Sequence, residues 1–153
     1  MNRLHPRIRL LWGARTVLVA LVAGAGTAAA DRFLLDLPAW APVAVGGLLL
    51  VGGLVLVLAR YRAWRYEVRE DSLYLERGVF TQVRTVVPFV RIQHVDSARG
   101  PVERAVGLAN TVVYTAGSRG ADVTVPGLTS EGADDLRERL KRLAIRAETE
   151  DAV

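Results

Sequence analysis

Leu37–Ala59 (LPAWAPVAVGGLLLVGGLVLVLA) is an unbroken apolar stretch with no charged residue and no Asn, Gln or His. As an α-helix with a rise of ~1.5 Å per residue it would be about 34 Å long, enough to cross a hydrocarbon core of ~30 Å. A long helix on the surface of a soluble domain normally keeps a polar stripe, and this stretch has none. The stretch therefore predicts a transmembrane helix.

A second apolar segment, Thr16–Ala30, precedes it. Alone it would reach only about 22 Å as a helix, so we extend it back to Leu10, with the Arg15 side chain directed toward the headgroups. The alternative is a cleaved signal peptide, because a basic leader, an apolar core and small residues before Asp31 are also present. We favour a helical hairpin within residues 1–62, with helices at about 10–30 and 37–59, and the alternative stays open.

The connection between the two predicted helices is short. It comprises Asp31–Asp36, and we expect Asp36 to cap the second helix and Pro38 to lie in its first turn. Small residues at helical spacing allow close contact between membrane helices, although glycine is also common in such helices without a packing role. The small residues with this spacing are Gly24, Ala28, Gly26, Ala30, Ala39, Gly46 and Gly53.

Arginine is concentrated on one side of this hairpin. Four arginines precede it, four follow within ten residues, and only Arg32 lies in the loop. The positive-inside rule then predicts a multi-pass plasma-membrane protein with both termini and the C-terminal domain in the cytoplasm. Arg60, Arg62 and Arg65 lie just past the second helix, where they either contact anionic lipid or only fix the topology.

The rest of the chain reads as a small β-rich domain at residues 63–148. Alternation of apolar and polar residues begins at Trp64 and predicts a series of short strands. The predicted strands are Trp64–Arg69, the segment around Leu73 and Leu75, Val83–Val90, Ile92–Val95, Leu108–Ala116 with Leu108, Val112 and Tyr114 on one face, and, after a turn at 118–120, the segment around Val123 and Val125. Gly100–Gly107 predicts one helical turn.

An amphipathic helix closes the domain. It is expected to begin at Thr129 or Ser130 and to end near Ala147, followed by a disordered tail at 149–153. Its apolar stripe consists of Ala133, Leu136, Leu140, Leu143 and Ala147.

Three segments carry a family resemblance. They are ERGVF (Glu76–Phe80), VPFVRIQHVDSARGPVERAVGLANTVVYTAG (Val87–Gly117) and GLTSEGADDLRERL (Gly127–Leu140). Together they resemble the bacterial pleckstrin-homology-like (PH-like), membrane-flanked domain family of the YdbS type. The resemblance implies two membrane helices followed by a bent, mostly-β sandwich that a C-terminal α-helix plugs at one end. It implies no catalytic or ligand residues, since the family defines none.

The sequence offers little for catalysis. His94 and Asp96 are two residues apart in an extended segment, but a metal or acid–base site needs a further partner, and the only other histidine is His5. The chain has no cysteine, no G-x-S-x-G elbow and no phosphate-binding loop. We therefore expect a non-enzymatic protein without cofactor or metal.

The charged residues around the short helical turn are the candidate partner-binding face. They are Arg91, Arg99, Glu103 and Arg104. Loops on a rigid scaffold often carry binding, so we expect an interaction domain that assembles with another membrane protein or with itself. The alternative is a sensor of anionic lipid headgroups, and an arginine excess beside a membrane points to lipid before nucleic acid.

Overall fold

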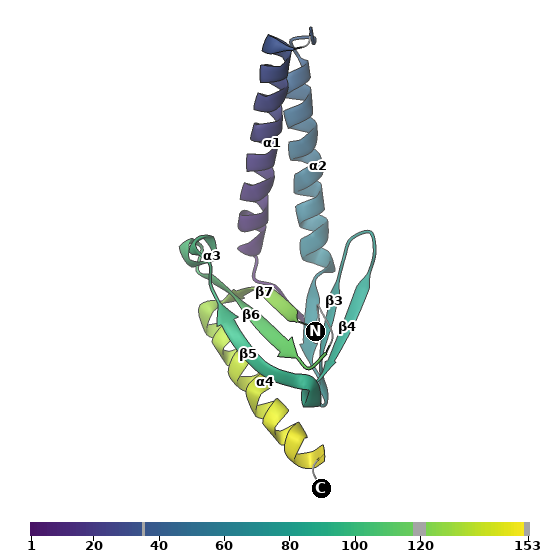
Figure 1. The fold of residues 1–153 in the computed structure, drawn as a ribbon, viewed down its shortest axis with the longest axis vertical. Coiled ribbons are helices and arrows are strands. Elements are labelled where there is room, and N and C mark those ends of the chain that lie inside the picture. The colour runs from purple at the N-terminus through teal and green to yellow at the C-terminus, as the bar shows by residue number, and fades with distance from the viewer. Residues whose placement is uncertain (35, 118–121, 152–153) are drawn as a thin grey trace.

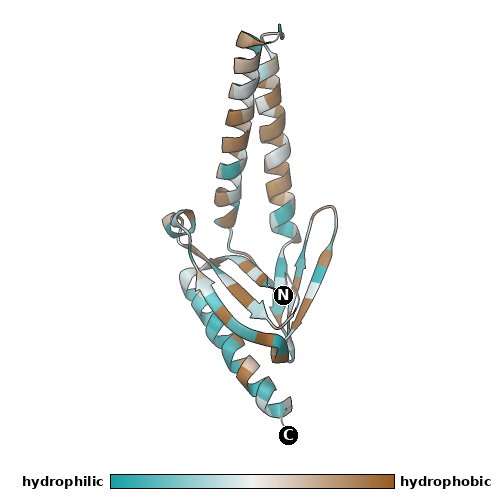
Figure 2. Ribbon diagram, viewed as in Figure 1, coloured by the Kyte–Doolittle hydropathy of each residue, from teal (hydrophilic) through white to brown (hydrophobic). Residues whose placement is uncertain are grey.

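Two long antiparallel helices rise from a β-rich domain in the computed structural model, which describes residues 1–34, 36–117 and 122–151 (Figure 1). The helices are α1 (Ile8–Phe33) and α2 (Ala41–Ala63), and both are long and apolar enough to cross a membrane. Most of their large apolar side chains are exposed. The apolar composition of both helices contrasts with the mostly hydrophilic residues of the C-terminal helix (Figure 2). The hairpin predicted from the sequence is therefore present.

The second helix begins later than expected, at Ala41, and ends at Ala63. Asp36 is not its cap, because Trp40 takes that position and makes no capping bond through its side chain. Pro42 explains the shift: it has no N–H to donate, so it belongs in the first turn of a helix, and a start at residue 37 would place it further in. The connection is ordered instead by Asp31, whose Oδ1 accepts a hydrogen bond from the Leu37 N–H at 2.7 Å.

Small residues bring the two helices together. A Cβ added to Gly24 would lie 3.7 Å from the Gly46 Cα, so the backbones are in near contact there. A Cβ on Gly53 would collide with the Thr16 methyl group. Gly26 has open space around it, so only part of the predicted small-residue pattern packs the hairpin.

Within the described residues, seven strands form two antiparallel sheets. The first has the order β1-β2-β3-β4, and the second has the order β5-β6-β7. Their bounds are β1 Asn2–Arg3, β2 Arg65–Val68, β3 Ser72–Arg77, β4 Val83–Pro88, β5 Ile92–Ala98, β6 Leu108–Thr115 and β7 Val123–Thr129. The short helix η1 (Phe89–Arg91) links the sheets, and α3 (Pro101–Ala105) links β5 to β6. The mostly-β sandwich with a C-terminal helix is confirmed; the predicted turn at 118–120 lies outside the described residues.

The last helix, α4 (Ser130–Asp151), packs against the second sheet and η1 (Figure 1). The Thr129 Oγ1 accepts a hydrogen bond from the Gly132 N–H at 3.0 Å and so caps its first turn. Leu140 is fully buried, as its place in the apolar stripe predicts. The expected tail was wrong for residues 149–151, which continue the helix.

The segment before α1 is part of the domain, which the sequence reasoning did not predict. Asn2 pairs with Tyr66 across β1 and β2. Leu4 and Ile8 are 2% and 3% exposed, and both belong to the central hydrophobic cluster. The His5 N–H also donates to the Gly127 carbonyl at 2.7 Å. Cleavage after residue 30 would remove these core contacts, which argues against the signal-peptide alternative.

Candidate interaction site

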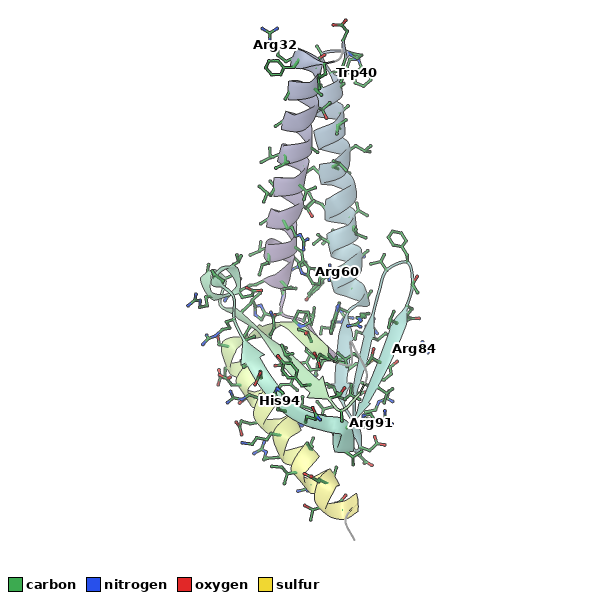
Figure 3. The ribbon with its side chains drawn as sticks, viewed as in Figure 1. Arg32, Trp40, Arg60, Arg84, Arg91 and His94 are labelled. Carbon is green, nitrogen blue, oxygen red and sulfur yellow. The ribbon has the colours of Figure 1, made fainter. Side chains whose placement is uncertain are left out.

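A groove of about 460 Å³ runs between β5 and α4. Its strand wall is Ile92–Val95, and its helix wall consists of Arg137, Glu138, Lys141, Ala144, Ile145 and Glu148. Figure 3 shows His94 on β5 beside α4. A second hollow of about 360 Å³ shares Ile92, Gln93, Ala144 and Glu148 with the groove and extends it to η1.

The strand wall of the groove is the free edge of a sheet. β5 pairs with β6 on one side and has no strand partner on the other among the described residues. Unpaired N–H and C=O groups on such an edge are a template for an added strand. Beside this edge, Ile145 is 56% exposed, so the groove combines backbone hydrogen-bonding groups with an exposed apolar side chain in a mostly charged helix wall.

The charges that line the groove are partly uncompensated. Arg137 pairs with Asp134 at 3.9 Å and with Glu138 at 3.3 Å. No ion pair engages Lys141 or Arg91 within the described part of the chain. The groove therefore offers basic side chains next to apolar ones, together with Glu148, which also has no ion pair in the described residues.

His94 has a structural contact. Its ring stacks on Tyr114 with centroids 4.1 Å apart and an interplanar angle of 18°. In the described ranges, no group of three or more His, Asp or Glu side chains is placed to hold a metal ion. His94 therefore forms part of the strand wall of the groove, and Lys141 lines the same groove from the helix.

The four predicted partner-binding residues do not form one cluster. Arg91 belongs to η1 and lines the extension of the groove, whereas Glu103 and Arg104 belong to α3 and Arg99 lies two residues before it. These positions lie at opposite ends of β5, whose seven residues span about 23 Å. The expected grouping of Arg91 with the helical turn was therefore wrong.

Around α3, the charged side chains are partly engaged. The Arg99 Nη1 donates a hydrogen bond to the Ser130 Oγ at 2.7 Å, which ties the β5–α3 connection to the start of α4. The Glu103 carboxylate lies against the Gly100 backbone. The structure thus gives Arg99 a structural contact in addition to its surface position.

The juxtamembrane arginines lie where the hairpin meets the domain. Figure 3 places Arg60 at this junction, and its guanidinium lies 4.4 Å from the Trp12 ring centroid. Arg62 lies in the last turn of the same helix at an exposed position, and Arg65 begins β2. These positions suit contact with lipid headgroups.

Two ionisable groups near β1 have shifted pKa values. Burial raises the pKa of the Tyr66 phenol, and a hydrogen bond with Asn2 opposes the shift. The pKa of Glu67 is lowered, first by the hydrogen bond from Arg69 and then by the chain's amino group. Both groups belong to the contact between β1 and β2, not to the groove.

The sequence reasoning missed the groove. One signal was present: Ala144 and Ile145 are apolar positions outside the stripe that docks α4. A single exposed isoleucine is common on protein surfaces, so this signal alone does not predict a contact surface.

Comparison with known proteins places the chain among bacterial membrane proteins. Residues 15–144 match the model of the bacterial PH domain family. The UPF0699 transmembrane protein YdbS of Bacillus subtilis (strain 168) is 37% identical over 111 residues, which cover 70% of this chain and 68% of that protein. The UPF0699 transmembrane protein YdbT of the same organism is 24% identical over 106 residues, which cover 68% of this chain but 22% of that protein.

No solved structure matches the chain significantly. The family description and the two relatives' names state no enzymatic activity. The family match covers most of the chain, and the helical hairpin followed by two antiparallel sheets and a docked C-terminal helix is the architecture that the resemblance implied. The chain is a transmembrane member of the bacterial PH domain family.

Proposed function

We propose that this protein is a non-enzymatic, membrane-anchored interaction module whose PH-like domain binds an extended segment of another membrane protein. The observation that carries the proposal is the groove between the free edge of β5 and α4. An added strand would take its affinity from backbone hydrogen bonds and its specificity from alternate side chains.

The chemistry of the groove describes the expected partner. Ile145 and Ala144 supply an apolar wall, while Lys141 and Arg91 supply positive charge without an ion pair in the described residues. A partner segment that alternates apolar with acidic side chains fits these walls. The hairpin confines the domain to a thin layer at the bilayer, which raises its effective concentration toward other membrane proteins.

The proposal includes the orientation in the membrane. Both termini and the domain lie in the cytoplasm, because arginine flanks both helices on that side. The packing of Leu4 and Ile8 in the domain core supports a common side for the N-terminus and the domain. A reporter enzyme fused after Val153 should be active as a cytosolic protein, and activity outside the cytoplasm would contradict this orientation.

Anionic-lipid sensing is the second candidate function. Arg60, Arg62 and Arg65 lie at the junction with the membrane helices, where each contributes on the order of 1 kcal/mol of attraction to an anionic surface. A sensor must respond to lipid composition, so its test is the affinity of the full-length protein for labelled anionic lipid in mixed bilayers.

Site-specific photo-cross-linking tests the main proposal. A photo-reactive residue at Ile145, in the full-length protein in native membranes, should cross-link to a segment of another membrane protein that is rich in acidic and apolar residues. The same residue at Val86, which is 54% exposed on β4, is the positional control and should not cross-link to it.

A charge reversal on the same helix is the matched control for chemistry. Lys141→Glu should abolish the Ile145 cross-link, whereas Arg139→Glu should preserve it, because Arg139 is exposed on α4 but does not line the groove. Equal loss in both variants, or a cross-link only to a second copy of this chain, would contradict the proposed partner.

A further inference from the structure

The connection between β3 and β4, residues 78–82, carries an exposed apolar tip. Phe80 is 91% exposed, Val79 is 39% exposed, and Val83 at the start of β4 is 41% exposed. A phenylalanine this exposed on a soluble surface forfeits most of the hydrophobic stabilisation that burial would give it. These three residues are called the apolar tip below.

The turn that carries the apolar tip has a tightly packed backbone. Gly78 has a φ of +108°, and a Cβ at this position would collide with the Thr81 carbonyl oxygen. Only glycine fits such a backbone without strain. Below the turn, Glu76 accepts a hydrogen bond from Gln82 and pairs with Arg84 at 3.5 Å. These contacts fix the hairpin that carries Phe80.

The apolar tip lies on the membrane side of the domain. The β3–β4 hairpin rises beside α2 on the side from which the membrane helices emerge (Figure 1). In Figure 3 the β3–β4 connection reaches the level of Arg60, which stacks on Trp12 at the junction between hairpin and domain. A loop at this level meets the bilayer surface that the hairpin crosses.

The charges near the tip suit an anionic surface. Arg77 ends β3 and Arg84 is the second residue of β4, and the acid next to Arg77, Glu76, is already paired with Arg84. Exposed apolar residues such as Phe bury at the boundary between headgroups and acyl chains, where basic residues beside them meet the headgroups.

We propose that the apolar tip inserts into the lipid interface and forms a third attachment of the domain to the bilayer, beside the two membrane helices. The attachment fixes the tilt of the domain and the direction in which the β5–α4 groove faces. The occupant of the tip is lipid, because the tip lies on the side of the domain from which the membrane helices emerge.

A second apolar point lies on the other side of the hairpin. Val102 in α3 is 56% exposed. The turn after α3 is beside the base of α1, since a Cβ at Gly107 would lie 3.3 Å from Nη1 of Arg7. Contacts with the bilayer on both sides of the hairpin fix the orientation of the domain, whereas one contact alone leaves the domain free to tilt.

The test uses the full-length protein in vesicles of phosphatidylglycerol and phosphatidylethanolamine that contain lipids with a quencher on the acyl chain. The chain has no cysteine, so Thr81→Cys gives a single labelling site next to an intact Phe80. An environment-sensitive fluorophore there should show blue-shifted emission that the lipid-borne quencher reduces strongly. Val90→Cys in η1, 54% exposed at the opposite end of β4, is the matched control and should be quenched weakly.

Phe80→Asp on the Thr81→Cys background separates insertion from mere proximity. Phe80 touches little of the fold, so this variant should melt as the parent does while its label loses the blue shift and the quenching. Three results would overturn the proposal: equal quenching at residues 81 and 90, quenching that persists in Phe80→Asp, and a blue shift without quenching, which indicates burial against protein.

Discussion

Replacing Leu4 by Ala should destabilise a domain from which Leu4 is separated in sequence by an entire membrane hairpin. Leu4 is 2% exposed, and its carbonyl accepts a hydrogen bond from the Tyr61 hydroxyl at 3.1 Å. Leucine-to-alanine changes in packed cores cost about 2–5 kcal/mol. For a domain of this size each kcal/mol lowers the melting temperature by roughly 4–8 °C, so we expect a decrease of at least about 8 °C.

Near-ultraviolet circular dichroism of the full-length protein in nanodiscs measures this transition, because Trp64 is 4% exposed in the same cluster. Leu10→Ala is the matched control: Leu10 is 65% exposed on α1 and should change the melting temperature little. A Leu4→Ala protein that melts with the wild type would show that the N-terminal segment does not dock, and the inference that it belongs to the core would fail.

Further predictions concern the docked helix, the hairpin and pH. Leu140→Asp places an unpaired charge at a fully buried site and should unfold the domain; thermal melting checks this, and an unchanged transition would mean that α4 does not dock. Gly53→Leu should force α1 and α2 apart at Thr16, so the distance between spin labels on the two helices should increase, and an unchanged distance would contradict the close contact. Burial raises the pKa of Tyr66 in the folded state, so the folded state favours the neutral phenol. The contribution of this group to the free energy of unfolding is therefore complete below about pH 10 and is lost as the pH rises further. Wild-type stability should therefore fall more steeply above pH 10 than that of Tyr66→Phe, and parallel pH profiles would contradict this assignment.

The parts of the fold that depend on local periodicity could be read from the sequence. An uncharged stretch of membrane length predicts a spanning helix by itself, and the spacing of Leu136 and Leu140 predicts a docked helix face. The resemblance to the bacterial PH family supplied the arrangement of the strands as a bent sandwich that the last helix plugs. These predictions needed no information about distant parts of the chain.

The parts of the fold that depend on contacts between distant residues could not be predicted from the sequence. Asn2 pairs with Tyr66 and Leu4 is buried among residues that follow both membrane helices, and no local pattern reports such partners. In β6 a register shift between Ala109 and Thr111 changes which residues face the core, so Thr111 and Val113 are fully buried instead of the expected face with Val112. The interaction groove depends in the same way on how α4 lies beside β5.

The pairing of β1 with β2 has a consequence for how the protein is made. These neighbouring strands are joined by the whole transmembrane hairpin, so the first sheet lacks its outermost strand until α1 and α2 have both been inserted. A hairpin inserted with one helix missing or reversed would leave Asn2–Arg3 and Leu4 on the wrong side of the bilayer. The domain would then expose apolar core residues to chaperones and proteases, which act on incompletely folded chains. Because the sheet is complete only after correct insertion, only a correctly inserted protein escapes degradation. The cell thus detects an error in topology as an error in folding.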